Sequence, residues 1–160
     1  MGQVKPKIYV ETTVVSYLAA RRSRDLVVAA HQQITEDWWH LRRADFDLFV
    51  SQSVVSEASA GDPEASLRRL EVLDSLPLLD ITDEVEVLAL SLLASRIVPK
   101  KASEDAIHIA VATVHGMDYL LTWNCRHIAN AEIRQQLADT VLERGYLLPV
   151  ICTPEELGGE

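Results

Sequence analysis

The stretch SEDAIHIAVATVHGMDYLLTWN, residues 103–124, decides the fold class. Its first part has the spacing of an apolar helix that starts at Ser103, the expected N-cap, and ends at Gly116. Its second part, 119–122, has the composition of a short strand. A helix that leads into a strand of a parallel sheet runs antiparallel to that strand. The N-terminus of the helix, with Asp105 in its first turn, is therefore expected at the carboxyl edge, where the strands of the sheet end.

The same alternation of strand and helix continues along the chain. Strands are expected at 7–10, 46–50, 78–81, 119–122 and 148–151, and helices at 12–20, 25–43, 53–60, from 63 onward, 83–94, 103–114 and 129–144. Asp25 and Thr82 are expected N-caps. Strands that alternate with helices imply a parallel sheet covered on both faces, in a chain of the α/β class. The acidic tail from Pro154 is expected to be loosely held.

The composition describes one ordinary globular domain. A chain of 160 residues, 48% apolar and 24% charged, is long enough to bury a core. No apolar run approaches the roughly 20 residues of a membrane span, and the short polar start does not resemble a signal peptide. Cys125 and Cys152 lack the spacing of metal ligands, and without a secretion signal they favour a reducing cytoplasm. Cys125 is expected to be a small buried thiol.

The net charge of -9 argues against a general nucleic-acid binder. Basic residues nevertheless cluster beside the expected carboxyl edge. Lys100 and Lys101 precede Asp105, and Arg126 and His127 follow the strand at 119–122. Solvated surface charge is the ordinary explanation for any one such pair. Their repeated placement beside acidic residues raises phosphate binding as an alternative.

Three carboxylates and one amide are expected at the carboxyl edge. Glu11 follows the strand at 7–10, Glu57 lies in the helix that leaves the strand at 46–50, Asn124 follows the strand at 119–122, and Asp105 reaches the edge as argued above. Carboxylates brought this close repel one another unless a cation lies among them. Oxygen donors favour Mg²⁺ or Mn²⁺ over Zn²⁺. Glu11, Glu57 and Asp105 are thus the expected metal ligands, in a site suited to phosphodiester hydrolysis.

Other common α/β activities lack their motifs. The chain contains neither of the glycine-rich phosphate loops, G-x-x-x-x-G-K-[ST] or G-x-G-x-x-G after the first strand. It also lacks the G-x-S-x-G elbow of α/β-hydrolases and histidine spacing for zinc. Nucleotide-cofactor enzymes, hydrolases of that fold and zinc enzymes are therefore disfavoured.

Each candidate residue also has a structural explanation. The first turn of a helix favours acidic residues such as Asp105 because of the helix dipole. Glu11 is harder to explain in this way, since a charge at the end of a buried strand is costly. Thr12 and Thr13 are suited to capping the first helix, and either hydroxyl is also suited to holding a metal-bound water. His108, on the same helix face as Asp105, is more often a packed core histidine than a ligand.

The segments IYVETTVVSYLAAR, SQSVVSEAS and SEDAIHIAVATVHGMDYLLTWN resemble the PIN-domain family, most closely the VapC-like toxins of bacterial toxin–antitoxin pairs. The resemblance covers nearly the whole chain. It implies a three-layer α/β/α sandwich with a central, mostly parallel five-stranded sheet, and a magnesium- or manganese-dependent ribonuclease. Glu11, Glu57 and Asp105 occupy the places of the three acids, and Asn124 that of a fourth polar residue. The family usually has Asp at the first place and often at the fourth.

The leading hypothesis is a metal-dependent endoribonuclease. Glu11, Glu57 and Asp105 would hold one or two Mg²⁺ or Mn²⁺ ions, and Asn124 with Thr13 would orient water or phosphate. A receiver-like phosphoacceptor domain is a poor alternative, because it needs paired acids after the first strand and a nucleophilic Asp directly after the third.

The same hypothesis assigns partners. Lys101 and Arg126 are expected to bind phosphates of an RNA substrate that flank the cleaved bond. The resemblance implies a cognate antitoxin and a homodimer, and nothing in the sequence points to a membrane. The alternative is a catalytically degenerate PIN-like module that binds RNA or protein. A metal-dependent cleavage assay with an acidic-site mutant separates the two.

Overall fold

A five-stranded parallel sheet forms the centre of the computed structural model, which describes residues 2–159. The strand order is β3-β2-β1-β4-β5, and each neighbouring pair is parallel. The strands are β1 (Lys7–Val10), β2 (Asp47–Ser51), β3 (Leu78–Leu79), β4 (Tyr119–Leu121) and β5 (Val150–Cys152). The expected α/β class and the parallel five-stranded sheet are confirmed.

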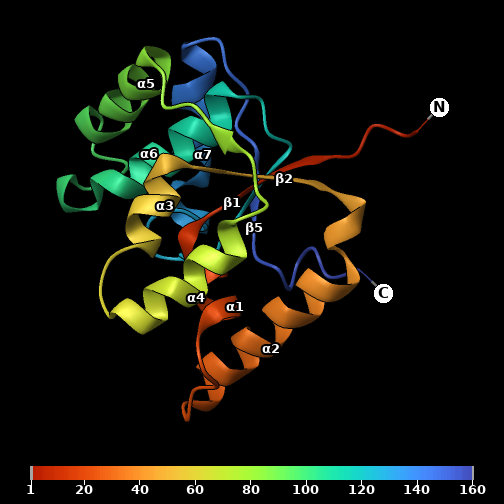
Figure 1. The fold of residues 1–160 in the computed structure, drawn as a ribbon. Coiled ribbons are helices and arrows are strands. Elements are labelled where there is room, and N and C mark those ends of the chain that lie inside the picture. Colours follow the sequence, from red (N-terminus) through yellow and green to blue (C-terminus); the bar gives the residue numbers. More distant parts are fainter. Residues whose placement is uncertain (1, 160) are drawn as a thin grey trace.

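Helices cover both faces of this sheet and make a three-layer sandwich (Figure 1). One layer holds α1 (Thr12–Ala19), α2 (Leu26–Leu41) and α4 (Pro63–Leu73), and the other holds α5 (Asp83–Ala94), α6 (Ser103–Val114) and α7 (Ala131–Glu143). The short helix α3 (Gln52–Ala58) contacts α1, α4 and α6. It therefore connects the two layers at the carboxyl edge of the sheet.

The central strands β1 and β4 lie in the core. Ile8, Tyr9 and Val10 of β1 are fully buried, as are Leu120 and Leu121 of β4. Full burial of an aliphatic side chain of this size contributes about 1.5–3 kcal/mol to folding. This burial explains why both strands are almost continuously apolar, as is usual when helices cover a parallel sheet on both faces.

The carboxyl ends of β1 and β4 form the switch point of the sheet. From β1 the chain moves outward to β2 and β3, whereas from β4 it moves the opposite way to β5. Helices diverge to opposite faces at such a point and leave a crevice where ligands bind. Val10 is paired with Leu121, and the next amide, Glu11 N–H, donates to the Leu121 carbonyl at 3.0 Å. This register places Glu11 beside Thr122 at the carboxyl edge of the sheet.

Two of the three N-caps expected for α2, α5 and α6 are confirmed. Asp25 accepts from the Val28 amide and Thr82 from the Val85 amide, as expected of N-caps. Ser103 does not cap α6, because it is the first helical residue and follows the 3₁₀ turn η2 (Lys100–Ala102). The 3₁₀ turn continues directly into the α-helix, so no separate capping residue is needed.

Two further expectations are wrong. The tail is held in place, because Leu157 packs against the core and its carbonyl accepts from Arg42 at 3.4 Å. Cys125 is exposed, since it lies in the loop after β4, whereas Cys152 is buried at the end of β5. Over residues 2–159, the helices lack the combination of length and hydrophobicity that a membrane span requires.

Candidate active site

Glu11 is a buried carboxylate at the end of the central strand. Only 2% of its surface is exposed. It occupies the N-cap position of α1, but its side chain makes no capping bond there. Its Oε1 instead accepts hydrogen bonds from the Thr13 hydroxyl at 2.5 Å and from the Thr122 hydroxyl at 2.6 Å. These two donors offset part of the cost of burying a charge.

The same two hydroxyls tie the loop after β4 to this carboxylate. Thr13 Oγ1 accepts from the Trp123 backbone N–H at 2.9 Å, and Thr122 Oγ1 accepts from the Asn124 backbone N–H at 2.9 Å. Each threonine therefore donates to Glu11 and accepts from the loop. The position of Glu11 is therefore fixed both from α1, through Thr13, and from the end of β4, through Thr122.

Glu57 comes to the same place from α3. Its Oε1 accepts from the Thr12 hydroxyl at 2.7 Å and lies 2.5 Å from Nε2 of His108. Thr12 and Thr13 were both candidates to cap α1, but they bind the two different carboxylates instead. Their adjacent positions in the first turn of α1 allow one to reach Glu57 and the other Glu11.

His108 is both a core histidine and a neighbour of the carboxylates. It is fully buried, in the middle of α6. Its Nδ1 lies 2.6 Å from the Tyr9 hydroxyl, which in turn lies 2.8 Å from the Ser51 hydroxyl. A buried chain of hydrogen bonds thus runs from Ser51 through Tyr9 and His108 to Glu57.

The titration of the pair Glu57–His108 reflects this contact. Burial, the largest single effect, would lower the pKa of His108, but the hydrogen bond with Glu57 and the charges of nearby carboxylates outweigh it and raise that pKa above 6.5. Burial also disfavours the charge on Glu57, yet the hydrogen bond and charge of His108 bring the pKa of Glu57 below 4.5. Both directions describe one favourable acid–base pair.

Asp105 is held by a second histidine. Its Oδ2 lies 3.0 Å from Nδ1 of His127, in the loop after β4. Asn124 shapes that loop, because its Oδ1 accepts from the backbone N–H groups of Arg126 at 3.2 Å and His127 at 3.0 Å. The loop after β4 thereby contacts α6 as well as Glu11.

The grouping of donor atoms fits a divalent cation. Glu11, Glu57 and His108 each offer a donor atom, and the three atoms lie within 4.8 Å of one another. Asp105 is not part of that group. Over residues 2–159, the hydrogen bonds to both glutamates use Oε1 and none uses Oε2. Each carboxylate therefore keeps one oxygen for an ion, and carboxylate with imidazole is a donor set that divalent metals use.

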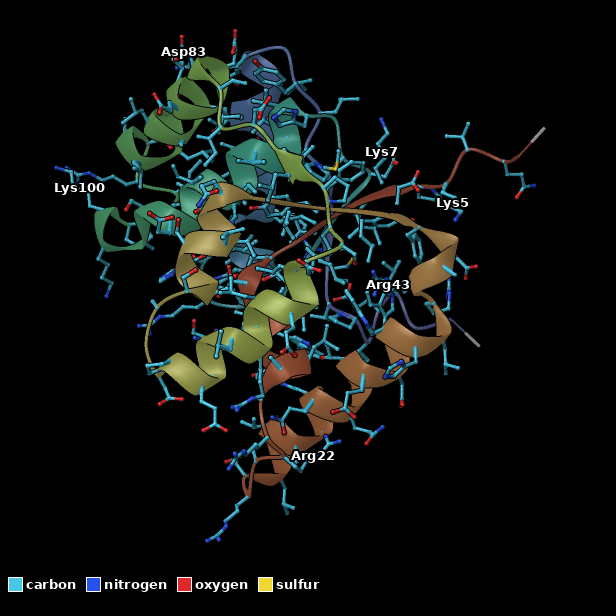
Figure 2. All side chains as sticks on the ribbon, in the orientation of Figure 1. Lys5, Lys7, Arg22, Arg43, Asp83 and Lys100 are labelled. Carbon is cyan, nitrogen blue, oxygen red and sulfur yellow. The ribbon has the colours of Figure 1, made fainter. Side chains whose placement is uncertain are left out.

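Two exposed basic residues lie close in sequence to the residues of this site. Lys101 belongs to the 3₁₀ turn directly before α6, and Arg126 to the loop after β4; both are exposed. Lys100, next to Lys101, extends away from the body of the molecule in Figure 2. These side chains are free to contact a polyanion without first breaking an ion pair within the described part of the chain.

Comparison with family models identifies the family of this chain. Residues 8–133 match the PIN domain, and this range includes Glu11, Glu57, Asp105 and Asn124. The chain belongs to the PIN-domain family. The resemblance inferred from the sequence is therefore confirmed.

A solved structure gives independent support for the PIN fold. The chain superposes with a TM-score of 0.57 and 12% identity on a chain from the crystal structure of VapBC2 from Rickettsia felis bound to a DNA fragment from their promoter. The match covers 92% of this chain and 98% of that chain. At this identity the likeness concerns the fold alone. Comparison with curated proteins gave no match.

The structure brings the predicted residues to one edge, with added partners. Glu11 and Glu57 lie together, Asn124 is joined to Glu11 through Thr122, and Asp105 faces His127. Sequence reasoning assigned no role to Thr122 or to the pairing of His127. The sequence indicates a role for these two residues only through their positions, because Thr122 directly follows β4 and His127 comes three residues after Asn124.

Proposed function

We propose that this PIN domain is a metal-dependent endoribonuclease, the toxin of a toxin–antitoxin pair, which uses Mg²⁺ or Mn²⁺ to hydrolyse RNA phosphodiester bonds. The observation that carries the proposal is the pair of carboxylates, Glu11 and Glu57, held with donor atoms within 4.8 Å at the switch point of the sheet. PIN domains are generally nucleases. Two acids held this close favour a divalent cation between them.

The acids divide the work. Glu11 and Glu57 hold the ion, each through the oxygen that its threonine donors leave free. Asp105, oriented by His127, is the third acid of the site. When bound, a divalent ion lowers the pKa of water and stabilises the charge that develops on the phosphate.

Asn124 and Thr13 position the reacting groups. The Asn124 Oδ1 is already bonded to two backbone amides, so this residue holds the loop that faces the phosphate. Thr13 keeps the Glu11 carboxylate in place through its hydroxyl. Asn124 acts through the loop that it holds, and Thr13 acts through the Glu11 carboxylate. In this way both residues orient water or phosphate.

Lys101 and Arg126 supply phosphate contacts. The net charge of -9 gives no general attraction for RNA, so local cations must provide it. Lys101→Glu and Arg126→Glu should each raise KM for RNA with little change in kcat, and both effects should shrink at high salt.

The proposal includes protein partners, an antitoxin and a second copy of the chain. Leu26, Val27 and Leu41 of α2 are exposed by 86%, 65% and 78%, and helical geometry places them on one side of that helix. Exposed apolar side chains at both ends of a surface helix are suited to protein contact. Leu41→Lys should weaken co-purification with the antitoxin or lower the mass measured in solution, without lowering the cleavage rate.

Cleavage of RNA by the purified protein tests the proposal. Activity should require Mn²⁺ or Mg²⁺, disappear with a chelator and disappear in Glu57→Gln. Asp83→Asn is a matched control, because Asp83 is an acid in the first turn of α5 and takes no part in the hydrogen bonds that hold Glu11, Glu57 and Asp105. If the protein binds RNA or another protein but cleaves nothing, the degenerate binding module replaces the nuclease.

A further inference from the structure

We propose that His108 is a direct ligand of the ion held by Glu11 and Glu57, which makes the site a mixed nitrogen–oxygen centre that selects Mn²⁺ over Mg²⁺. This inference rests on the proposed function, since it assumes an ion at that site. It differs from the sequence expectation of an all-oxygen site, because one of its donors is an imidazole on α6.

Distance supports this assignment first. A donor atom of His108 lies within 4.8 Å of one oxygen from each glutamate. His108 and Asp105 are three residues apart and project from the same side of α6. Asp105 is engaged by His127, whereas Nε2 of His108 is directed at Glu57.

The surroundings of the ring fix its orientation. Nδ1 of His108 lies 2.6 Å from the Tyr9 hydroxyl, and that hydroxyl lies 2.8 Å from Ser51 Oγ. With Nδ1–H donating to Tyr9 and the Tyr9 hydroxyl donating to Ser51, Nε2–H donates to the Glu57 carboxylate in the metal-free protein, and loss of this proton when an ion binds would leave the Nε2 lone pair free to coordinate it. Histidines that bind metals commonly have the other ring nitrogen held in this way.

Because His108 is buried, water is not available as a partner for its Nε2. His108 is fully buried, and within residues 2–159 its Nε2 has only the Glu57 carboxylate as a hydrogen-bond partner. An ion between Glu11 and Glu57 would replace the hydrogen bond to Glu57 as the partner of this nitrogen, while Nδ1 keeps its bond to Tyr9. His108 is therefore part of the metal site as well as part of the core.

The types of donor atom at the site then determine whether it prefers Mg²⁺ or Mn²⁺. Mg²⁺ prefers oxygen ligands and keeps several of its waters. A first-row divalent ion accepts imidazole nitrogen together with carboxylate oxygen more readily, even though Mn²⁺ is the weakest binder of that series. A site with one nitrogen donor should thus bind Mn²⁺ more tightly than Mg²⁺.

Pulsed electron paramagnetic resonance of Mn²⁺ added to the wild-type protein tests the ligand directly. A coordinated imidazole should give nitrogen modulation of the Mn²⁺ signal, which should change on labelling histidine with ¹⁵N. His127→Gln should retain the modulation, and His108→Gln should lose it. Bound Mn²⁺ without nitrogen modulation in the wild type overturns the proposal, and this holds even if His108→Gln fails to fold.

Titration of Mn²⁺ and Mg²⁺ by calorimetry tests the selectivity. The Kd for Mn²⁺ should be lower than that for Mg²⁺ in the wild type, and His108→Gln should narrow the ratio about tenfold, equivalent to about 1.4 kcal/mol. His115→Gln, a change at the far end of α6, should leave the ratio intact. An unchanged ratio in His108→Gln overturns the inference while metal-dependent cleavage still stands. Absence of any metal binding would overturn the proposed function as well.

Discussion

Nδ1 of His127 lies 3.0 Å from Oδ2 of Asp105, so the loop after β4 holds the acid at the start of α6. The same loop is bonded to Glu11 through Thr122 and Thr13. One loop therefore sets the position of two acids, one at the end of the central sheet and one in the helix layer that contains α6. The orientation of Asp105 depends on a residue more than twenty positions away.

The pairing of His127 with Asp105 predicts a moderate effect on activity. His127→Gln should lower metal-dependent cleavage about tenfold, because the loss of one positioning hydrogen bond is equivalent to about 1.4 kcal/mol in the barrier. The melting temperature should change little, since His127 lies at the surface end of the site. Initial rates with a fluorescent RNA measure the effect. A rate equal to wild type would show that Asp105 needs no such support.

The two hydrogen bonds of the Thr13 hydroxyl predict that removing this hydroxyl lowers the stability of the protein. Thr13→Val removes the donor to Glu11 and the acceptor for the Trp123 amide, at a cost of about 1–3 kcal/mol for the groups left unsatisfied. A domain of this size should then melt about 2–4 °C lower for each kcal/mol lost. Thermal denaturation with chelator measures the shift. Thr13→Ser keeps the hydroxyl and should recover most of the loss; equal melting of Val and Ser variants contradicts the account.

The fold could be predicted from the sequence because its signals are local. The apolar run at β1, the turn glycine after α6 and the alternation of strand with helix define a parallel sheet without any knowledge of distant contacts. The positions of the acids could be predicted in the same way, because the carboxyl ends of parallel strands lie at the same edge of the sheet. Family resemblance added the three-layer arrangement.

The partners of these acids could not be predicted in the same way. Whether Thr12 binds Glu57 or caps α1 depends on the position of α3, which the sequence does not specify locally. His108 seemed a core residue because its neighbours along α6 are apolar, and its contact with Glu57 spans 51 positions. The N-cap role expected of Ser103 is wrong because a 3₁₀ turn precedes α6 and makes Ser103 its first helical residue.

The Glu57–His108 pair predicts how stability depends on pH. The lowered pKa of Glu57 contributes stability above about pH 4.5, and this is lost as pH falls through the folded value. The raised pKa of His108 contributes stability below about pH 6.5, and this is lost as pH rises through the folded value. Both contributions are complete between those two values, so the pair should stabilise the metal-free protein most in that window.

Urea unfolding of wild type and Glu57→Gln, with chelator across this pH range, measures the contribution of the pair. The difference in free energy of unfolding between the two proteins should be largest inside the window and decrease on both sides. A difference that does not vary with pH would mean that Glu57 and His108 are not coupled in the folded protein.

Divalent metal should stabilise the protein. An ion that binds only the native state adds about 2.7 kcal/mol at roughly 100 times its Kd, which corresponds to a rise of about 5–10 °C in melting temperature. Glu57→Gln should show a much smaller rise, because it lacks one charged ligand, while Asp83→Asn should respond like wild type. Melting curves with chelator and with Mn²⁺ provide the comparison. Identical wild-type curves in the two conditions would remove the physical basis for a metal site.

If this edge of the sheet is the catalytic centre of a nuclease, cleavage of RNA should be lost when Asp105→Asn removes one of its acids. Asparagine preserves the size of the side chain and one oxygen, but it removes the charge that faces His127 and acts on His108. The account predicts that Asp105→Asn folds like wild type by circular dichroism and loses Mn²⁺- or Mg²⁺-dependent cleavage, while Asp83→Asn retains it. Cleavage by purified Asp105→Asn at the wild-type rate would contradict the account.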